Sequence, residues 1–262
     1  MRKAAKRTLA VHGGGTMVVW SGHQGIGKTT TALWTTDQLA ERFEEDDPAA
    51  FRTRYYETGR IPETATKPGK KAVRTLFKKT PGPLDDGVYR RAEMEDLAET
   101  VLAGFIQHNI QMVFIDEAGL LSVEAIRGLV YVRNLAETKG WDLTLVFIGM
   151  DDLPGKMRSV PQIDRRVEEW VTFERYDLQE THSLLGELHP HFAGLDLDDP
   201  EDREQVEYLH DQYGGLPAQL VACLRKLEGH RERVGRDIDL TLLKAAHLLT
   251  VRDRKRAEEH SY

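Results

Sequence analysis

The chain has 262 residues, 40% of them hydrophobic, which suffices for one large α/β domain with a small appendage and does not favour a disordered chain. A net charge of -7 argues against a protein whose whole surface coats nucleic acid, although it is compatible with a local basic patch. The single cysteine, Cys223, excludes an intramolecular disulfide, and no apolar run approaches the roughly 20 residues of a membrane span, so we expect a cytoplasmic location.

The first residues, MRKAAKRTLAVHGGG, are basic and contain no acidic residue. They superficially resemble a transit peptide, but the first strand is expected from about Thr16, which leaves little to cleave. We therefore interpret Arg2, Lys3, Lys6 and Arg7 as a retained basic arm, either a solvated tail or a segment that contacts phosphates.

Short apolar runs bounded by glycine or charge alternate with helical patterns along the first two thirds of the chain. This alternation is typical of an α/β fold with a mostly parallel sheet and crossover helices. We expect all of the strands to be central and buried except residues 51–57, whose alternating polarity predicts an edge strand. The five expected strands are residues 16–21, 51–57, 111–116, 143–149 and 170–174.

The pattern becomes purely helical after Glu174, which predicts an α/β core over residues 1–175 and an all-helical lid over 176–262. Aspartates before helical patterns predict N-caps, either Asp198 or Asp199 before Pro200, and Asp237 later. The helices expected in the lid are residues 177–192, 199–213, 216–232 and 237–259.

A glycine-rich loop follows the first strand and matches the pattern G-x-x-x-x-G-K-[ST] at every fixed position. Such glycines let successive N–H groups point at a β-phosphate, and the helix that begins near Lys28 adds its positive end. Lys28 would bridge the β- and γ-phosphates and Thr29 would ligate Mg²⁺, which predicts ATP and Mg²⁺ as cofactors. The alternative is a glycine turn without a ligand. The expected nucleotide-binding residues are Gly22, His23, Gln24, Gly25, Ile26, Gly27, Lys28, Thr29 and Thr30.

In the stretch MVFIDEAGLL, the acidic residues Asp116 and Glu117 directly follow an apolar strand. Asp116 is expected at the carboxyl edge of the sheet beside the phosphate loop, where it would hold Mg²⁺ together with Thr29. Glu117 suits a base that activates the attacking water. The alternative for this pair is a helix cap, but in combination with the phosphate loop the two acids predict an ATPase.

Residues 109–157 and 162–180 resemble the core of the AAA+ regulators of DNA transposition, the TnsC, TniB and MuB group. The resemblance covers about residues 16–230 and includes a helix that ends in Asn134-Leu135-Ala136-Glu137. It implies a P-loop AAA+ fold with a helical lid, and regulation of transposition by an ATPase that recruits a transposase. Secretion and defence ATPases share this core. Relatives often carry a docking segment before the first strand, and the few residues there in this chain leave little room for one.

Membership of that family implies assembly into a ring or a helical filament, with nucleotide between subunits. An arginine from one subunit would then act on its neighbour's γ-phosphate. Arg166 matches the family position best, and Arg165 is adjacent. The alternative is two surface arginines paired with Asp164, Glu168 or Glu169.

Two departures from the family pattern predict slow hydrolysis, typical of a timer more than of a motor. Met150 stands where many AAA+ proteins carry a polar residue after the fourth strand. The lid reads Gly-Leu-Pro-Ala at residues 215–218, where relatives often carry an arginine in place of Ala218.

Residues 52–91 are strongly basic within an acidic chain. Lys70, Lys71, Arg74 and Lys78 recur at spacings of three or four, which predicts a short helix with a basic face that binds double-stranded DNA without reading sequence. The alternative is a solvated, flexible loop over residues 58–83. The expected DNA-binding residues are Lys70, Lys71, Arg74, Lys78 and Lys79; the other cations of the stretch are Arg52, Arg54, Arg60, Lys67, Arg90 and Arg91.

Two other functions remain alternatives to a DNA-bound regulator of transposition. The first is a secretion, defence or signalling ATPase that never contacts DNA, and the second is a scaffold that binds ATP without hydrolysing it. His182, His189 and His191 lie close together in the sequence but lack cysteines or suitably spaced acids, so we expect no zinc site.

Overall fold

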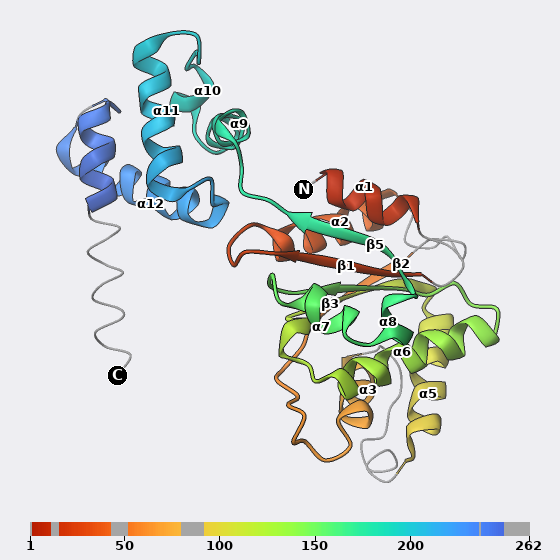
Figure 1. Ribbon diagram of the computed structural model, residues 1–262. Helices are drawn as coiled ribbons and strands as arrows, with labels where there is room; N and C mark the ends of the chain where they lie inside the picture. Colours follow the sequence, from red (N-terminus) through yellow and green to blue (C-terminus); the bar gives the residue numbers. More distant parts are fainter. Residues whose placement is uncertain (1, 12–15, 43–51, 80–91, 236, 249–262) are drawn as a thin grey trace. The chain divides into compact units, whose positions relative to one another are not determined.

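The computed structural model describes residues 2–11, 16–42, 52–79, 92–235 and 237–248 (Figure 1). Contacts divide the chain into two compact units. Unit 1 consists of Met1–Gln24 and Lys28–Phe173, and unit 2 consists of Gly25–Gly27 and Glu174–Tyr262.

Unit 1 is built on a five-stranded sheet with the order β2-β3-β4-β1-β5, in which every strand pair is parallel. The predicted α/β class and the five strands are therefore confirmed, with β2 at an edge as expected. The strands are β1 (Met17–Gly22), β2 (Arg52–Glu57), β3 (Ile110–Asp116), β4 (Thr144–Ile148) and β5 (Val167–Phe173).

The prediction that the fifth strand is central was wrong, because β5 forms the second edge of the sheet and pairs only with β1. Its side chains are exposed or half-buried, except for the buried Val171. Beside β5 lies the N-terminal helix α1 (Arg2–Ala10) and, among the described residues, no further strand of the sheet. Arg7 of this helix pairs with Glu169 and donates to the Trp170 carbonyl oxygen at 3.1 Å.

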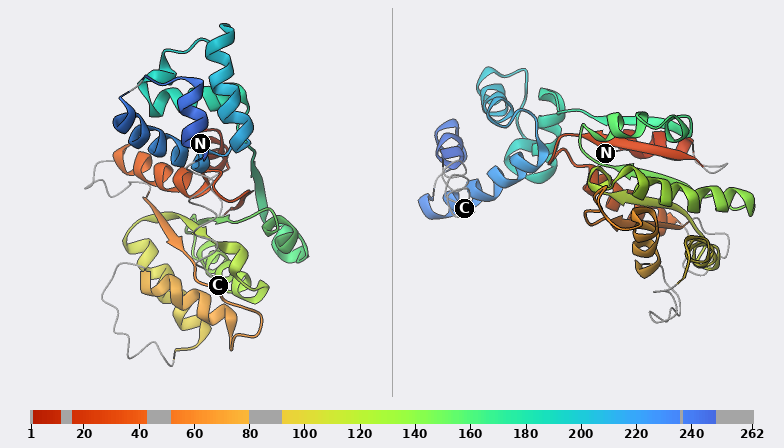
Figure 2. Two further views of the ribbon diagram at one scale, coloured as in Figure 1. Left: turned by 90° about the vertical axis from the view of Figure 1, so that its left-hand side faces the viewer. Right: turned by 60° about the horizontal axis from the view of Figure 1, so that its bottom comes forward.

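Helices cover both faces of the sheet in unit 1 (Figures 1 and 2). Because strand side chains alternate, Met17 and Val19 of β1 join the core on one face, while Val18 and Trp20 join the core on the other. The first face is covered by α3 (Pro68–Lys79), α5 (Met94–Gln107), α6 (Val123–Thr138) and α7 (Leu153–Arg158), and the second by α1 (Arg2–Ala10) and α2 (Lys28–Arg42).

The N-terminal segment is not the basic arm that its composition predicted. It forms α1, in which Ala4 and Thr8 are buried. The Trp20 indole N–H donates to the Thr8 hydroxyl oxygen at 2.8 Å. The apolar side of this short helix therefore packs on the sheet, a contact that the basic composition of the segment does not indicate.

The basic residues from Lys70 to Lys79 lie on helix α3, as predicted. The preceding residues 58–67 form turns and bends with mostly exposed side chains, as the loop alternative predicts for that part of the segment. Residue Ile61 forms a parallel bridge with Leu121, and α3 then packs against α5 and α6. Residues 80–83 of the expected loop lie outside the part of the chain that the structure describes.

Unit 2 is helical, and its core forms around Leu185, Phe192 and Leu220. Asp199 caps its helix, as one of the two predictions had it, by accepting from the backbone N–H groups of Glu201 and Asp202. The helices are α9 (Leu178–Leu188), α10 (Pro190–Ala193), α11 (Pro200–Tyr213), α12 (Pro217–Val234) and residues 240–248.

The final helix begins later than predicted, because Asp239 and not Asp237 precedes its first turn. The Asp239 carboxylate accepts from the Leu242 backbone N–H at 2.7 Å. Among the described residues, no helix has the length and apolar character needed to cross a membrane.

Candidate nucleotide-binding site

The phosphate loop connects the end of β1 at Gly22 to the start of α2 at Lys28. Gly25 and Gly27 have φ angles of +79° and +98°, a left-handed region in which a side chain would be strained. The backbone therefore has the glycine-dependent curl that brings N–H groups to face a phosphate.

Lys28 is held within this loop. Its ammonium donates to the carbonyl oxygens of Gly22 at 2.7 Å and His23 at 2.9 Å, and the residue is buried. Burial lowers the pKa of Lys28 below its ordinary value, an effect opposed chiefly by the nearby carboxylate of Asp116. A lysine placed by backbone carbonyls at the first turn of α2 is well positioned to meet a phosphate.

The sheet brings Thr29 and Asp116 together, although they are far apart in sequence. The Thr29 hydroxyl donates to the Asp116 Oδ2 atom at 2.6 Å. The backbone N–H of Glu117 donates to the other carboxylate oxygen, Oδ1, at 2.8 Å. Asp116 is buried, so these donors compensate the desolvation of its charge.

A further donor to Asp116 comes from β2 and was missed in the sequence. The Tyr55 hydroxyl donates to Asp116 Oδ2 at 2.7 Å. Burial, followed by the hydrogen bond and charge of Asp116, raises the pKa of the Tyr55 hydroxyl well above its usual range, so it remains a donor at neutral pH. The sequence marked 51–57 as an edge strand but gave no signal that Tyr55 reaches Asp116.

Glu117 is exposed and adopts a left-handed conformation with φ 57° and ψ 30°. A non-glycine residue in this region is uncommon and is often found at functional sites. The short 3₁₀ helix η1 (Ala118–Leu120) follows, and the Lys156 ammonium donates to carbonyl oxygens on it and after it, Gly119 and Leu121. Lys156 therefore helps to fix the turn that begins at Glu117, a role that its sequence position did not suggest.

The oxygen atoms gathered here suit magnesium. Mg²⁺ typically takes one or two protein oxygens and keeps the rest of its octahedral shell for water and substrate phosphates. The carboxylate of Asp116 and the hydroxyl of Thr29 meet that requirement in composition and proximity. In the part of the chain that the structure describes, no group of three or more His, Cys, Asp or Glu residues gathers as a metal site.

The histidines considered above each have a protein partner in unit 2. His182 contacts the Phe192 carbonyl oxygen, His189 pairs with Glu228, and His191 contacts the side chain of Gln205. The hydrogen bond from His189 lowers the pKa of Glu228 below its usual value.

The two positions that depart from the family pattern have different surroundings. Met150, just after β4, is 46% exposed. In unit 2, the backbone N–H of Ala218 donates to the Gly25 carbonyl oxygen at 3.1 Å, so the short side chain of Ala218 faces the phosphate loop residue Gly25.

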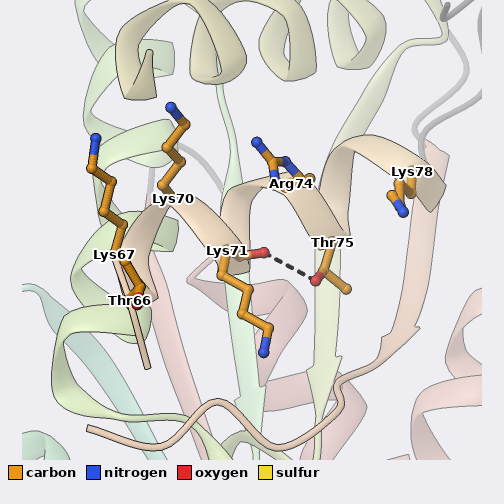
Figure 3. Close-up of a pocket in the computed structure, with 7 residues that line it drawn as sticks. All are labelled: Thr66, Lys67, Lys70, Lys71, Arg74, Thr75 and Lys78. Atoms are coloured by element: carbon orange, nitrogen blue, oxygen red, sulfur yellow. Dashed lines mark hydrogen bonds between the residues drawn. The ribbon is translucent and has the colours of Figure 1, made fainter. Parts of the chain in front are cut away.

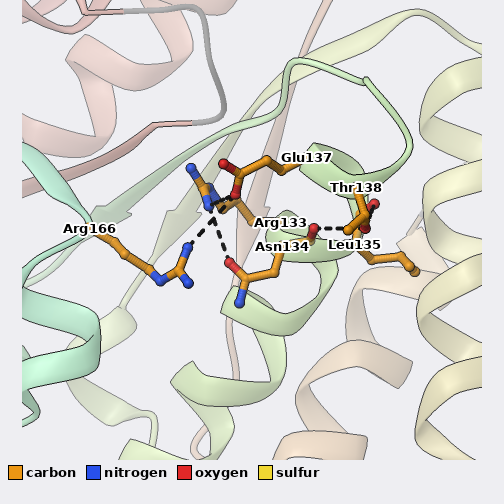
Figure 4. A network of polar contacts seen from close by, with 6 residues as sticks. All are labelled: Arg133, Asn134, Leu135, Glu137, Thr138 and Arg166. Atoms are coloured by element: carbon orange, nitrogen blue, oxygen red, sulfur yellow. Dashed lines mark hydrogen bonds and ion pairs between the residues drawn. The ribbon is translucent and has the colours of Figure 1, made fainter.

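Arg166 belongs to a polar network at the end of α6 (Figure 4). The Oε2 atom of Glu137 lies 2.6 Å from Nη1 of Arg133 and 3.8 Å from Nη1 of Arg166. The partners proposed from sequence for a surface-paired Arg166 were Asp164, Glu168 and Glu169, and none of these forms the pair observed. Arg165 is exposed beside it.

Basic side chains from α3 and the turn before it line a cavity of about 470 Å³ (Figure 3). Lys71 and Lys78 are exposed, whereas Lys70 and Arg74 are half-buried. The nitrogen of Lys70 lies 3.7 Å from Glu93. The lining residues are Thr66, Lys67, Lys70, Lys71, Arg74, Thr75 and Lys78.

The remaining cations of the basic segment divide into described and undescribed positions. Lys79 is the last residue of α3, but its side chain lies outside what the structure describes, and so do Arg90 and Arg91.

Five of the seven residues that line the cavity are cationic, which favours an anionic ligand with repeated charges.

A family model described as "AAA domain" matches residues 11–157, more than half of the chain. This range contains the phosphate loop, Asp116, Glu117 and the basic helix α3. No curated protein sequence matches the chain significantly.

Several solved structures share the fold. The Aeropyrum pernix ORC2 protein, solved with ADPNP and ADP, superposes with a TM-score of 0.68 at 19% identity, over 94% of this chain and 67% of that one. The ORC1 protein of the same organism, in complex with DNA, superposes with a TM-score of 0.61 at 16% sequence identity, over 97% of this chain and 65% of that one. Domain III of the Thermotoga maritima replication initiation protein DnaA superposes with a TM-score of 0.60 at 15% sequence identity, over 94% of this chain and 90% of that one.

Proposed function

The chain belongs to the AAA domain family and is an ATPase, and we propose that it binds Mg-ATP, oligomerises on double-stranded DNA and regulates DNA transposition. It spans 67% and 65% of the two ORC proteins, so its activity as a whole protein is part of this proposal. Residues 176–262, which belong to unit 2, serve as the helical lid.

The nucleotide chemistry follows from the site. Lys28 exchanges its two carbonyl contacts for the β- and γ-phosphates, and the N–H groups of residues 22–30 cradle the phosphate chain. Thr29 and Asp116 would hold Mg²⁺, which would supply positive charge beside the phosphates. Glu117 orients and activates the attacking water.

Hydrolysis is slow in this proposal. Neither Met150 nor Ala218 offers a polar group to the γ-phosphate, so less charge is stabilised than in relatives that carry both contacts. ATP binding then holds an assembly together, and slow hydrolysis takes it apart.

Assembly supplies the missing cation. Arg166, with Arg165 beside it, reaches the γ-phosphate of a neighbouring subunit in a ring or filament. Within one chain Arg166 lies 3.8 Å from Glu137, a spacing at which a partly exposed ion pair is weak enough to exchange for a phosphate.

The cavity lined by five cations on and beside α3 is the observation that carries the DNA part of the proposal. Lys71 and Lys78 are exposed and can neutralise phosphates without reading base sequence. The likeness to the ORC1 protein, whose structure was solved in complex with DNA, supports this choice of ligand at the level of fold.

Regulation of transposition rests on the resemblance of residues 109–157 and 162–180 to the TnsC, TniB and MuB group. The helix end Asn134-Leu135-Ala136-Glu137 that carries this resemblance contributes Glu137 to the network with Arg166. In the assembled form the protein recruits a transposase to DNA.

The test is sedimentation and negative-stain imaging of the protein with a non-hydrolysable ATP analogue, with and without duplex DNA, at low and moderate salt. We expect rings or filaments that need nucleotide and DNA and weaken steeply with salt. An assembly that forms with nucleotide alone and ignores DNA would sink the DNA proposal and leave the ATPase standing.

A second candidate is an ATPase of a secretion, defence or signalling system that never contacts DNA. It is favoured because part of the positive charge on and before α3 is neutralised within the chain. The ammonium groups of Lys67 and Lys70 lie 3.9 and 3.7 Å from the carboxylate of Glu93. This candidate predicts full function after Lys71 and Lys78 are replaced by alanine.

A further inference from the structure

We propose that Tyr55 is a positioning residue for Asp116: its hydroxyl fixes the carboxylate in the orientation that binds magnesium. The inference rests on the Mg-ATP site of the proposed function and adds a residue to it that the phosphate loop and acidic motifs do not contain. Its basis is the 2.7 Å hydrogen bond from the Tyr55 hydroxyl to Asp116 Oδ2.

The carboxylate of Asp116 has donors on both oxygens. Oδ2 accepts from Tyr55 and from Thr29 at 2.7 and 2.6 Å, and Oδ1 accepts from the Glu117 N–H at 2.8 Å. A carboxylate oxygen has two acceptor positions, so Tyr55 and Thr29 together occupy those of Oδ2. Rotation of the carboxylate would break at least one of these bonds, and its plane is therefore fixed before any metal arrives.

The sheet explains why a tyrosine at this position reaches the site. In the parallel pairing of β2 with β3, Tyr55 lies opposite Phe114, and Glu57 lies opposite Asp116. The long Tyr55 side chain spans this two-residue offset on the face of the sheet that α2 covers, where Thr29 also lies. The neighbouring Tyr56 points to the opposite face and joins the other core.

The backbone reinforces the same contact. Thr58, which follows β2, donates its N–H at 3.1 Å and its hydroxyl at 2.7 Å to the carbonyl oxygen of Asp116. The end of β2 therefore holds Asp116 by main chain and side chain. Thr58 binds its carbonyl oxygen, and among the described residues of β2 only Tyr55 binds its carboxylate.

A purely structural role makes a different prediction. The ring of Tyr55 is half-buried against the core on the α2 face, and phenylalanine would fill the same space. If only the ring matters, Tyr55→Phe leaves magnesium binding unchanged. If the hydroxyl positions Asp116, the same substitution weakens magnesium binding, because groups that orient a metal ligand typically contribute 10–100-fold to metal affinity.

The experiment titrates Mg²⁺ against the binding of a fluorescent, non-hydrolysable ATP analogue, using the full chain. For Tyr55→Phe we expect the Mg²⁺ concentration at half-saturation to rise by about 10-fold or more. The affinity for the analogue in EDTA should stay at the wild-type value. Tyr131→Phe is the matched control, since Tyr131 is an exposed tyrosine on α6.

The outcomes separate the two proposals. If the wild-type protein shows no Mg²⁺-dependent binding of the analogue, the proposed Mg-ATP site itself fails. If the wild type depends on Mg²⁺ and Tyr55→Phe matches it, Tyr55 has no positioning role. A loss of affinity in EDTA as large as the loss with Mg²⁺ would also overturn the inference, because it would show a general disruption of the site.

Discussion

Gly69 of α3 and Gly128 of α6 meet backbone to backbone. A Cβ atom built on Gly128 would lie 2.5 Å from the carbonyl oxygen of Gly69, and one built on Gly69 would lie 2.9 Å from the Glu124 carbonyl oxygen. The absence of side chains at this crossing lets the basic helix lie directly on the helix that follows the acidic turn at Glu117.

Replacement of Gly128 by alanine should destabilise the protein. Alanine normally stabilises a helix interior relative to glycine, but here its methyl group meets backbone that cannot move aside without shifting α3. We expect the free energy of unfolding to fall by about 1–3 kcal/mol, as for other overpacked sites. Chemical denaturation measures it.

The matched control for that substitution is Gly155→Ala in α7, where a Cβ would meet nothing within 4 Å. It should be neutral or more stable by up to about 1 kcal/mol. Equal unfolding midpoints for Gly128→Ala and Gly155→Ala would contradict the close crossing of α3 and α6.

The double substitution Lys71→Ala with Lys78→Ala should weaken binding to duplex DNA of any sequence. Each phosphate contact contributes about 0.9 to the slope of log K against log salt concentration, so losing two should flatten the slope by about 2. Fluorescence anisotropy across a salt series measures this. Lys139→Ala, an exposed lysine at the end of α6, should leave affinity and slope unchanged.

Glu117→Gln should keep ATP binding and lose hydrolysis. The amide preserves size but cannot take a proton from the attacking water, so we expect the rate to fall by about 10²–10⁴-fold. Phosphate release and analogue binding, measured in parallel, separate the two effects. An unchanged hydrolysis rate would assign the base to another residue.

Arg166→Ala should reduce hydrolysis by about 10³-fold or more without affecting nucleotide binding to a single subunit. Mixing it with Lys28→Ala should restore part of the activity, because one variant keeps the nucleotide site and the other keeps the arginine. Arg127→Ala, which removes an exposed arginine paired with Glu124, is the control. Full activity of Arg166→Ala alone would exclude the trans-acting role.

Cys223 should be a slow thiol in the folded protein. It is buried, and burial raises the pKa of its thiol, so less reactive thiolate is present at pH 8 than in the unfolded chain. We expect labelling by a disulfide reagent to be at least about 100-fold slower in buffer than in denaturant, because access requires local opening. Equal rates would show that the core of unit 2 is open.

The strands and the phosphate loop were accessible from sequence because their signals are local. Continuous apolar runs identified β1, β3 and β4, and the spacing of Gly22, Gly27 and Lys28 identified the loop. β5 and α1 were misjudged: the apolar residues Trp170, Val171 and Phe173 made β5 look like a central strand, and the charges of α1 concealed the packing of Ala4 and Thr8.

The sequence by itself determined the chemistry available at the site: an ammonium at Lys28, a hydroxyl at Thr29 and acids at 116 and 117. Their assembly was decided by the strand order, because β3 and β1 flank β4 and end at the same edge of the sheet. The tertiary structure alone placed Tyr55 on Asp116 and paired Arg166 with Glu137. Such contacts depend on parallel register and helix packing between distant segments, which leave no periodic trace in the sequence.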